Sequence, residues 1–222
     1  MPARMLHTSW LGAGVLNVTA TESNGPGFVQ VARAGTLARP ASSNLNLTTR
    51  NQTIASLVIV PMSSTGWLAI YTSGTTHLVA DVLGYFTRDP APNSFVALFV
   101  PLAPERVIDS RAASRLGGLH FDGSAGTSTP LRFEGLPTVF GAGVLNVTAT
   151  ESNGPGFVQA GVDLVAGAYS NLNVDSSNQT IPNLVIAKTD HSSGPNFQRP
   201  LELFTSNTSH LVVDIFGWFI GL

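Results

Sequence analysis

Apolar and polar side chains alternate over short runs of this chain, as they do in β-strands. Residues 16–21 read LNVTAT, a period of two that places one set of side chains on each face of a sheet. The next six residues, ESNGPG, are typical of a turn, because Gly adopts positive φ and Pro fixes φ. Residues 28–31, FVQV, then restart the alternation. The segment predicts two strands joined by a polar turn, in the form of a hairpin.

This segment occurs twice, because residues 12–30 and 141–159 both read GAGVLNVTATESNGPGFVQ. The chain therefore contains an internal repeat. Three further matches follow in the same order: SNLN at 43–46 and 170–173, NQTI at 51–54 and 178–181, and a closing run, LAIYTSGTTHLVADVLGYF at 68–86 and LELFTSNTSHLVVDIFGWF at 201–219. Strands about ten residues apart, with no sustained helical period, predict an all-β fold of short antiparallel strands, a β-sandwich or a barrel.

The repeats are predicted to span 1–90 and 102–222, with a proline-containing linker at 91–101. The second repeat carries residues 112–140 between PERVIDSR and its copy of the shared stretch. The first repeat passes almost directly from the related PARMLHTS to Gly12. We expect the extra segment to add a strand at Pro130–Glu134. Because a truncated repeat would leave a strand edge bare, the repeats are predicted to pack together with pseudo-twofold symmetry.

Composition excludes several classes of protein and site. Only 11% of the 222 residues are charged, the net charge is −2, and there is no basic run of the kind that binds nucleic acid. No apolar run approaches the length of a membrane-spanning helix. The chain has no cysteine, so disulfides and thiolate metal ligands are excluded. The first residues lack a signal-peptide pattern, so a signal for export is not expected in this chain. No cofactor and no metal site are predicted.

One aspartate lies within the most apolar run of each repeat. Asp81 and Asp214 occupy the same place in the closing runs, where a buried charge costs several kcal/mol unless it is paired. Arg4 and Arg106 are the arginines at matching places in both repeats. We predict buried structural ion pairs between Arg4 and Asp81 and between Arg106 and Asp214. A catalytic or metal-binding aspartate is the alternative.

Catalytic candidates are few. Glu22 and Glu151 lie in the repeated turn, and two carboxylates are the minimum that a glycosidase needs. Asp109, Asp190 and His191 are further weak candidates. A Glu in such a turn is otherwise solvated surface. The sequence shows no nucleophile elbow, phosphate-binding loop, H-E-x-x-H motif or EF-hand loop.

Ligand-binding candidates gather in one loop of the second repeat. This loop, 188–200, is longer than its counterpart and contains Lys188, Asp190, His191 and Arg199. Loops on a β scaffold carry binding residues more often than the strands do. Trp67 is a further candidate, because an exposed indole would stack on a sugar ring, although Trp in a β protein often belongs to the core.

The ordered set of motifs, P-x-R-apolar-apolar-D-S-R, LNVTAT, SNLN and HLVxD(V/I)xG(Y/W)F, resembles a β-rich module of secreted and cell-surface bacterial proteins of the actinobacterial type. The resemblance covers Pro104–Phe219 and most of the first repeat, which departs from it at His7 and Ser9. Such modules are often appended in tandem to extracellular hydrolases or cell-wall proteins. The resemblance implies an extracellular accessory or adhesion-like module and supplies no catalytic residues.

Three functions are consistent with these observations. The first is a non-catalytic extracellular module that binds carbohydrate or cell wall, or that associates with itself as a homo-oligomer. The second is a hydrolase, a carboxylate-dependent glycosidase above all. The third is a purely structural surface protein.

Overall fold

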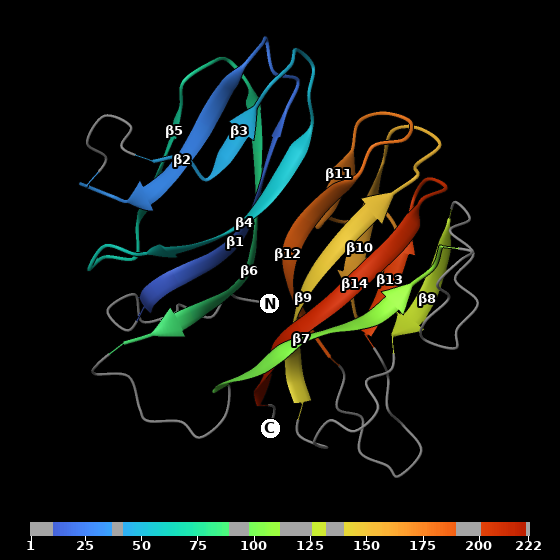
Figure 1. The fold of residues 1–222 in the computed structure, drawn as a ribbon. Coiled ribbons are helices and arrows are strands. Elements are labelled where there is room, and N and C mark those ends of the chain that lie inside the picture. The colour runs from blue at the N-terminus through green and yellow to red at the C-terminus, as the bar shows by residue number, and fades with distance from the viewer. Residues whose placement is uncertain are drawn as a thin grey trace. The chain divides into compact units, whose positions relative to one another are not determined.

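The computed structural model describes residues 11–36, 42–88, 98–111, 126–131, 140–189 and 201–220. Across these ranges the chain forms β-strands and no helix, so the predicted all-β fold is confirmed (Figure 1). Two compact units divide the chain, unit 1 from Met1 to Asn93 and unit 2 from Ser94 to Leu222. No helix long and apolar enough to cross a membrane occurs among the described residues. The pseudo-twofold packing of the repeats remains a prediction.

Unit 1 contains two antiparallel sheets of three strands each. One sheet has the order β4-β1-β6 and the other β3-β2-β5. The strands are β1 (Leu11–Thr21), β2 (Gly27–Arg33), β3 (Leu45–Leu47), β4 (Ile54–Pro61), β5 (Leu68–Thr72) and β6 (His77–Thr87).

Unit 2 repeats this arrangement and adds one strand to each sheet. Its sheets have the orders β12-β9-β14-β7 and β11-β10-β13-β8. The strands are β7 (Phe99–Asp109), β8 (Thr127–Leu131), β9 (Phe140–Thr150), β10 (Gly156–Gly161), β11 (Leu172–Val174), β12 (Ile181–Lys188), β13 (Leu201–Thr205) and β14 (His210–Ile220). By sequence and by pairing, β1–β6 correspond to β9–β14, whereas β7 and β8 have no counterpart among the described strands of unit 1.

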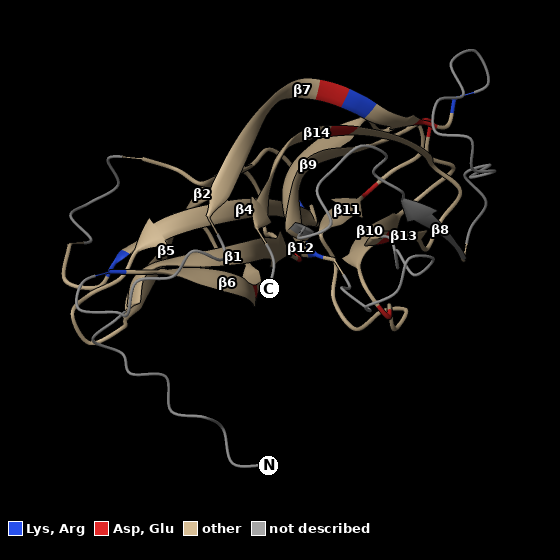
Figure 2. Ribbon diagram, turned by 90° about the horizontal axis from the view of Figure 1, so that it is seen from below, with Lys and Arg blue, Asp and Glu red and all other residues tan. Residues whose placement is uncertain are grey.

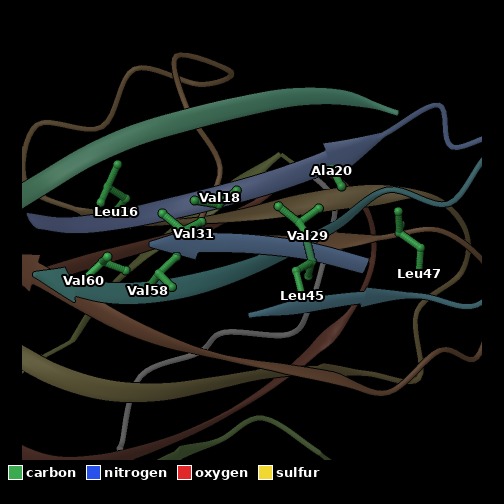
Figure 3. Close-up of a cluster of buried hydrophobic side chains, with 9 residues drawn as sticks. All are labelled: Leu16, Val18, Ala20, Val29, Val31, Leu45, Leu47, Val58 and Val60. Atoms are coloured by element: carbon green, nitrogen blue, oxygen red, sulfur yellow. The ribbon is translucent and has the colours of Figure 1, made fainter. Parts of the chain in front are cut away.

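The apolar face of each sheet meets that of its partner sheet. In unit 1 the two sheets enclose a cluster of side chains that are at most 7% exposed (Figure 3). Its members are the alternate residues that the period of two predicts for each strand. They are Leu16, Val18 and Ala20 of β1, Val29 and Val31 of β2, Leu45 and Leu47 of β3, and Val58 and Val60 of β4. Burial of each Val or Leu side chain stabilises the fold by about 1.5–3 kcal/mol.

The predicted hairpin between the first two strands is wrong. β1 pairs with β4 and β6, whereas β2 pairs with β3 and β5. The turn after β1 therefore carries the chain from one sheet to the other, so that both apolar faces meet the same core. Glu22 takes a left-handed φ of 51° here. Ser23 Oγ donates to Thr49 O at 2.9 Å and accepts from the Gln52 amide at 3.2 Å, which fastens the turn to a neighbouring loop.

Two boundaries differ from those expected. β7 begins at Phe99, so strand structure replaces the end of the predicted linker, and the division between the units falls at Asn93 and Ser94. The additional strand of the second repeat is β8 at Thr127–Leu131, three residues before the expected start. Its partner β13 sets this register, because Leu201 pairs with Leu131 and Thr205 with Thr127.

The closing runs at 68–86 and 201–219 end in stretches that are apolar on both faces, a pattern that predicts central strands buried on both sides. In unit 2 this is correct, since β14 lies between β9 and β7. In unit 1 the equivalent strand, β6, lies at the edge of its sheet as far as the described strands show, and most of its side chains are exposed. The difference arises because no described strand of unit 1 takes the place of β7.

Candidate functional site

A polar cluster lies where three strands of unit 2 end or begin. Asp109, the last residue of β7, pairs with Val212 near the start of β14, and His210 pairs with Thr150 at the end of β9. This register brings the end of β7, the start of β14 and the turn after β9 together. Figure 2 shows that the strands carry few charged residues and that an acidic and a basic residue are neighbours on β7.

Arg106 and Asp214 form the ion pair that their positions predict. Arg106 Nε donates to Asp214 Oδ1 at 2.8 Å and Nη2 donates to Oδ2 at 3.3 Å, a bidentate contact across the β7–β14 pair. This hydrogen bond raises the pKa of Arg106. The expected burial is wrong, because the side chains are 41% and 21% exposed. Since β7 is an edge strand, the pair faces water, and a pair this exposed contributes about 0–1 kcal/mol.

Asp109 is the buried charge of the cluster, with a side chain only 2% exposed. Arg111 Nε donates to its Oδ1 at 2.8 Å and Arg111 Nη2 to its Oδ2 at 2.5 Å. Arg106 Nη1 adds a longer contact of 3.5 Å. The hydrogen bonds from Arg111 are the main cause that lowers the pKa of Asp109. Asp109 is therefore an ionised anchor for two arginines.

Ser110, His210 and Glu151 form the third part of the cluster. Ser110 Oγ lies 3.2 Å from His210 Nδ1, and His210 Nε2 lies 3.9 Å from Glu151 Oε2. Ser110 Oγ also accepts the Leu211 amide at 2.8 Å, and the Ser110 amide donates to Leu211 O at 3.0 Å. These bonds join the end of β7 to the start of β14.

The cluster contains the residue types of a hydrolase but not a hydrolytic arrangement. Ser110 is buried and its Oγ already accepts a backbone amide, so it is poorly placed to attack a substrate. The lowered pKa of Asp109 does not suit the general acid of a glycosidase, which needs a raised pKa. The geometry therefore suits a clamp between strand ends.

Unit 1 contains only part of this cluster. His77 Nε2 lies 3.7 Å from Glu22 Oε2, a contact like that of His210 and Glu151 in unit 2, and both side chains are exposed. No ion pair to Asp81 occurs within the described part of the chain. Its predicted partner, Arg4, lies outside the described residues.

Of the remaining candidates, some belong to unit 1, some belong to unit 2 and some lie outside the described residues. Glu22 and Glu151 belong to different units, and each lies beside a histidine. Lys188 is exposed at the end of β12, while Asp190, His191 and Arg199 lie outside the described residues. Ser110, Arg111 and His210 were not predicted as site residues. The signal for Ser110 and Arg111 was the run DSR, and that for His210 was the run HLVVD, both within the motifs that carry the resemblance.

The two units also differ in how far the apolar side chains of β6 and β14 are exposed. Val82 of β6 is 70% exposed, but Ile215 at the same place on β14 is 2% exposed. Tyr85 is 46% exposed and its counterpart Trp218 is 8% exposed. The same sequence pattern is therefore covered in unit 2 and open in unit 1.

Aromatic side chains also lie on the β3-β2-β5 sheet of unit 1. Trp67, just before β5, is 68% exposed. Tyr71 on β5 is also exposed and packs against Phe28 of β2, with ring centroids 5.9 Å apart. Trp67 directly precedes β5, and Tyr71 lies four residues further along the chain. An even spacing puts residues of one extended segment on the same face of a sheet.

Within the described ranges, no three His, Asp or Glu side chains gather into a site for a metal ion. Comparison with known proteins gives no matching family model, no matching curated protein and no matching solved structure.

Proposed function

We propose that this protein is a non-catalytic extracellular module that binds carbohydrate or cell-wall polymer through unit 1. The observation that carries the proposal is the exposed indole of Trp67, directly before β5 and four residues before the exposed ring of Tyr71. The large, rigid rings of Trp and Tyr supply contact area at a low cost in conformational entropy. Such rings are suited to stacking on the apolar faces of sugars.

Charge and chemistry agree with this proposal. Only 11% of the residues are charged and the net charge is −2, which suits a neutral polymer. The carboxylate best placed within the polar cluster is tied to arginines and not poised for proton transfer. The extracellular location rests on the resemblance to modules of secreted and cell-surface proteins.

The first test is a pull-down of the purified chain on insoluble polysaccharides and bacterial cell walls. We expect Trp67→Ala to abolish retention and Tyr71→Ala to weaken it. Val165→Ala is the matched control, because Val165 is also 68% exposed but lies in unit 2. Equal retention of the Trp67→Ala and wild-type proteins would contradict the proposed surface.

A turnover screen on chromogenic glycosides and esters separates binding from hydrolysis. We expect no turnover from the wild type. Turnover that is lost in Glu22→Gln or Glu151→Gln would replace the proposal with a glycosidase.

Self-association is the second candidate function. The specific observation in its favour is the open β6 strand of unit 1, whose apolar side chains have covered counterparts in unit 2.

A further inference from the structure

We propose that the outer edge of β6 accepts residues Pro2–Ser9 of a second copy of this chain, in the place that β7 holds beside β14. This inference deepens the self-associating form of the proposed function. It does not depend on carbohydrate binding, which uses the other sheet of unit 1.

The β7–β14 contact of unit 2 is the template. Ile108 pairs with Val213 and Arg106 with Asp214 in an antiparallel register. The backbone of β7 approaches closely enough that a Cβ on Gly217 would clash with the Val100 carbonyl oxygen. β7 covers the edge of β14, and Arg106 of β7 neutralises Asp214, the one carboxylate on β14.

The outer edge of β6 is equivalent to the edge of β14 that pairs with β7, but no described strand pairs with it. Ala80, Asp81 and Gly84 hold the places of Val213, Asp214 and Gly217. A Cβ on Gly84 would meet nothing within 4 Å, which agrees with an open edge. Ala80 and Val82 are on the core side of β6, since they pair with Val18 and Leu16, yet both are exposed. An open edge of this kind is a site for addition of a strand.

The N-terminal segment has the matching sequence. PARMLHTS at 2–9 aligns with PERVIDSR at 104–111. In the β7 register, Arg4 lies opposite Asp81 and Leu6 opposite Ala80. Arg4 supplies a positive charge for Asp81, which has no ion pair among the described residues, and Leu6 supplies an apolar side chain next to an exposed apolar strand.

The segment cannot reach this place on its own unit. In the β7 register His7 lies beside Val79, because Asp109 pairs with Val212. Leu11 of the same chain pairs with Thr87. Val79 and Thr87 are about 26 Å apart along β6, but the four-residue step from His7 to Leu11 spans at most about 14 Å. In this register the strand must come from another copy.

Cysteine trapping tests the pairing, since the chain has no native cysteine. A Leu6→Cys chain is mixed with a differently tagged Ala80→Cys chain under mild oxidation. Residues paired in an antiparallel ladder have Cα atoms about 4.5–5.5 Å apart, within the range of a disulfide. We expect a disulfide-linked heterodimer. The control mixes the Leu6→Cys chain with a Val165→Cys chain, which should not cross-link.

Two results would overturn the inference. One is a heterodimer yield no higher than that of the Val165→Cys control. The other is a Leu6→Cys/Ala80→Cys double variant that cross-links within a monomer, because this would place the strand on its own unit.

Charge reversal tests the ion pair in the unmodified complex. We expect Arg4→Asp and Asp81→Arg each to lower the self-association constant by about tenfold, measured by sedimentation, and the two changes in one chain to restore it. Absence of rescue in folded protein would overturn the pairing. A wild-type chain that stays monomeric but is retained on polysaccharide overturns strand exchange and leaves carbohydrate binding intact. Self-association without the specific cross-link overturns strand exchange but not self-association.

Discussion

Charged side chains are scarce in this protein, and those at the end of β7 neutralise one another. Asp109 illustrates how neighbours decide the role of a carboxylate. From sequence alone it was a weak catalytic candidate, because nothing indicated that Arg111, two residues later, would fold back onto it. The ion pair of Arg106 with Asp214 was predictable, because both residues recur in the two repeats. Its exposure was not, since that depends on which strand forms the edge.

Asp109→Asn should destabilise unit 2 by about 2–3 kcal/mol at neutral pH, because it weakens charge-assisted hydrogen bonds to a buried group. The pKa of Asp109 is lower in the folded state than its ordinary value of 3.8. Its contribution to stability is therefore present above that value and is lost as the pH falls through the folded pKa. Urea unfolding across this range measures the effect.

The asparagine variant is also the control for this pH dependence. The difference in unfolding free energy between wild type and variant should shrink on acidification. A difference that stays constant between neutral pH and pH below the folded pKa would show that Asp109 does not act through its charge.

At the scale of the strand, β6 and β14 show that one pattern can have two environments. Both strands carry an apolar residue at almost every position. β14 is covered because β7 and β8 extend the two sheets of unit 2. The described strands of unit 1 lack these two additions, so Val82 and Tyr85 are exposed.

Matched substitutions on these strands test the difference. Ile215→Ala should destabilise unit 2 by about 2–4 kcal/mol, because it removes packing from a filled core. Val82→Ala should change the stability of unit 1 in the monomer by about 0.5 kcal/mol or less, as an exposed substitution does. Chemical unfolding of both variants at low protein concentration provides the measurement. Equal losses would show that the edge of β6 is covered in the monomer.

At the scale of the whole molecule, the chain consists of two units with separate sheets. Unit 2 has two more described strands and buries more large side chains, including Leu201, Leu203 and Leu211. Because stability rises with the apolar area buried, the two units should differ in stability.

We expect thermal unfolding of the monomer to show two transitions, with unit 1 melting first. Ile215→Ala should lower the upper transition and leave the lower one in place. Calorimetry at low protein concentration measures both. A single transition that Ile215→Ala shifts as a whole would show that the units unfold together.

The sequence by itself determined that the chain is all-β, that it contains two related repeats and that the second repeat has an additional segment. These properties follow from alternation of side chains and from identity between segments, which are local and need no knowledge of pairing. The partner of each strand was decided only by the tertiary structure. The same alternation suits a hairpin or a crossing between sheets, and only the shared core showed that β1 and β2 lie in different sheets. Which strand forms an edge, and therefore which apolar and charged side chains face water, also follows from pairing between residues distant in the chain.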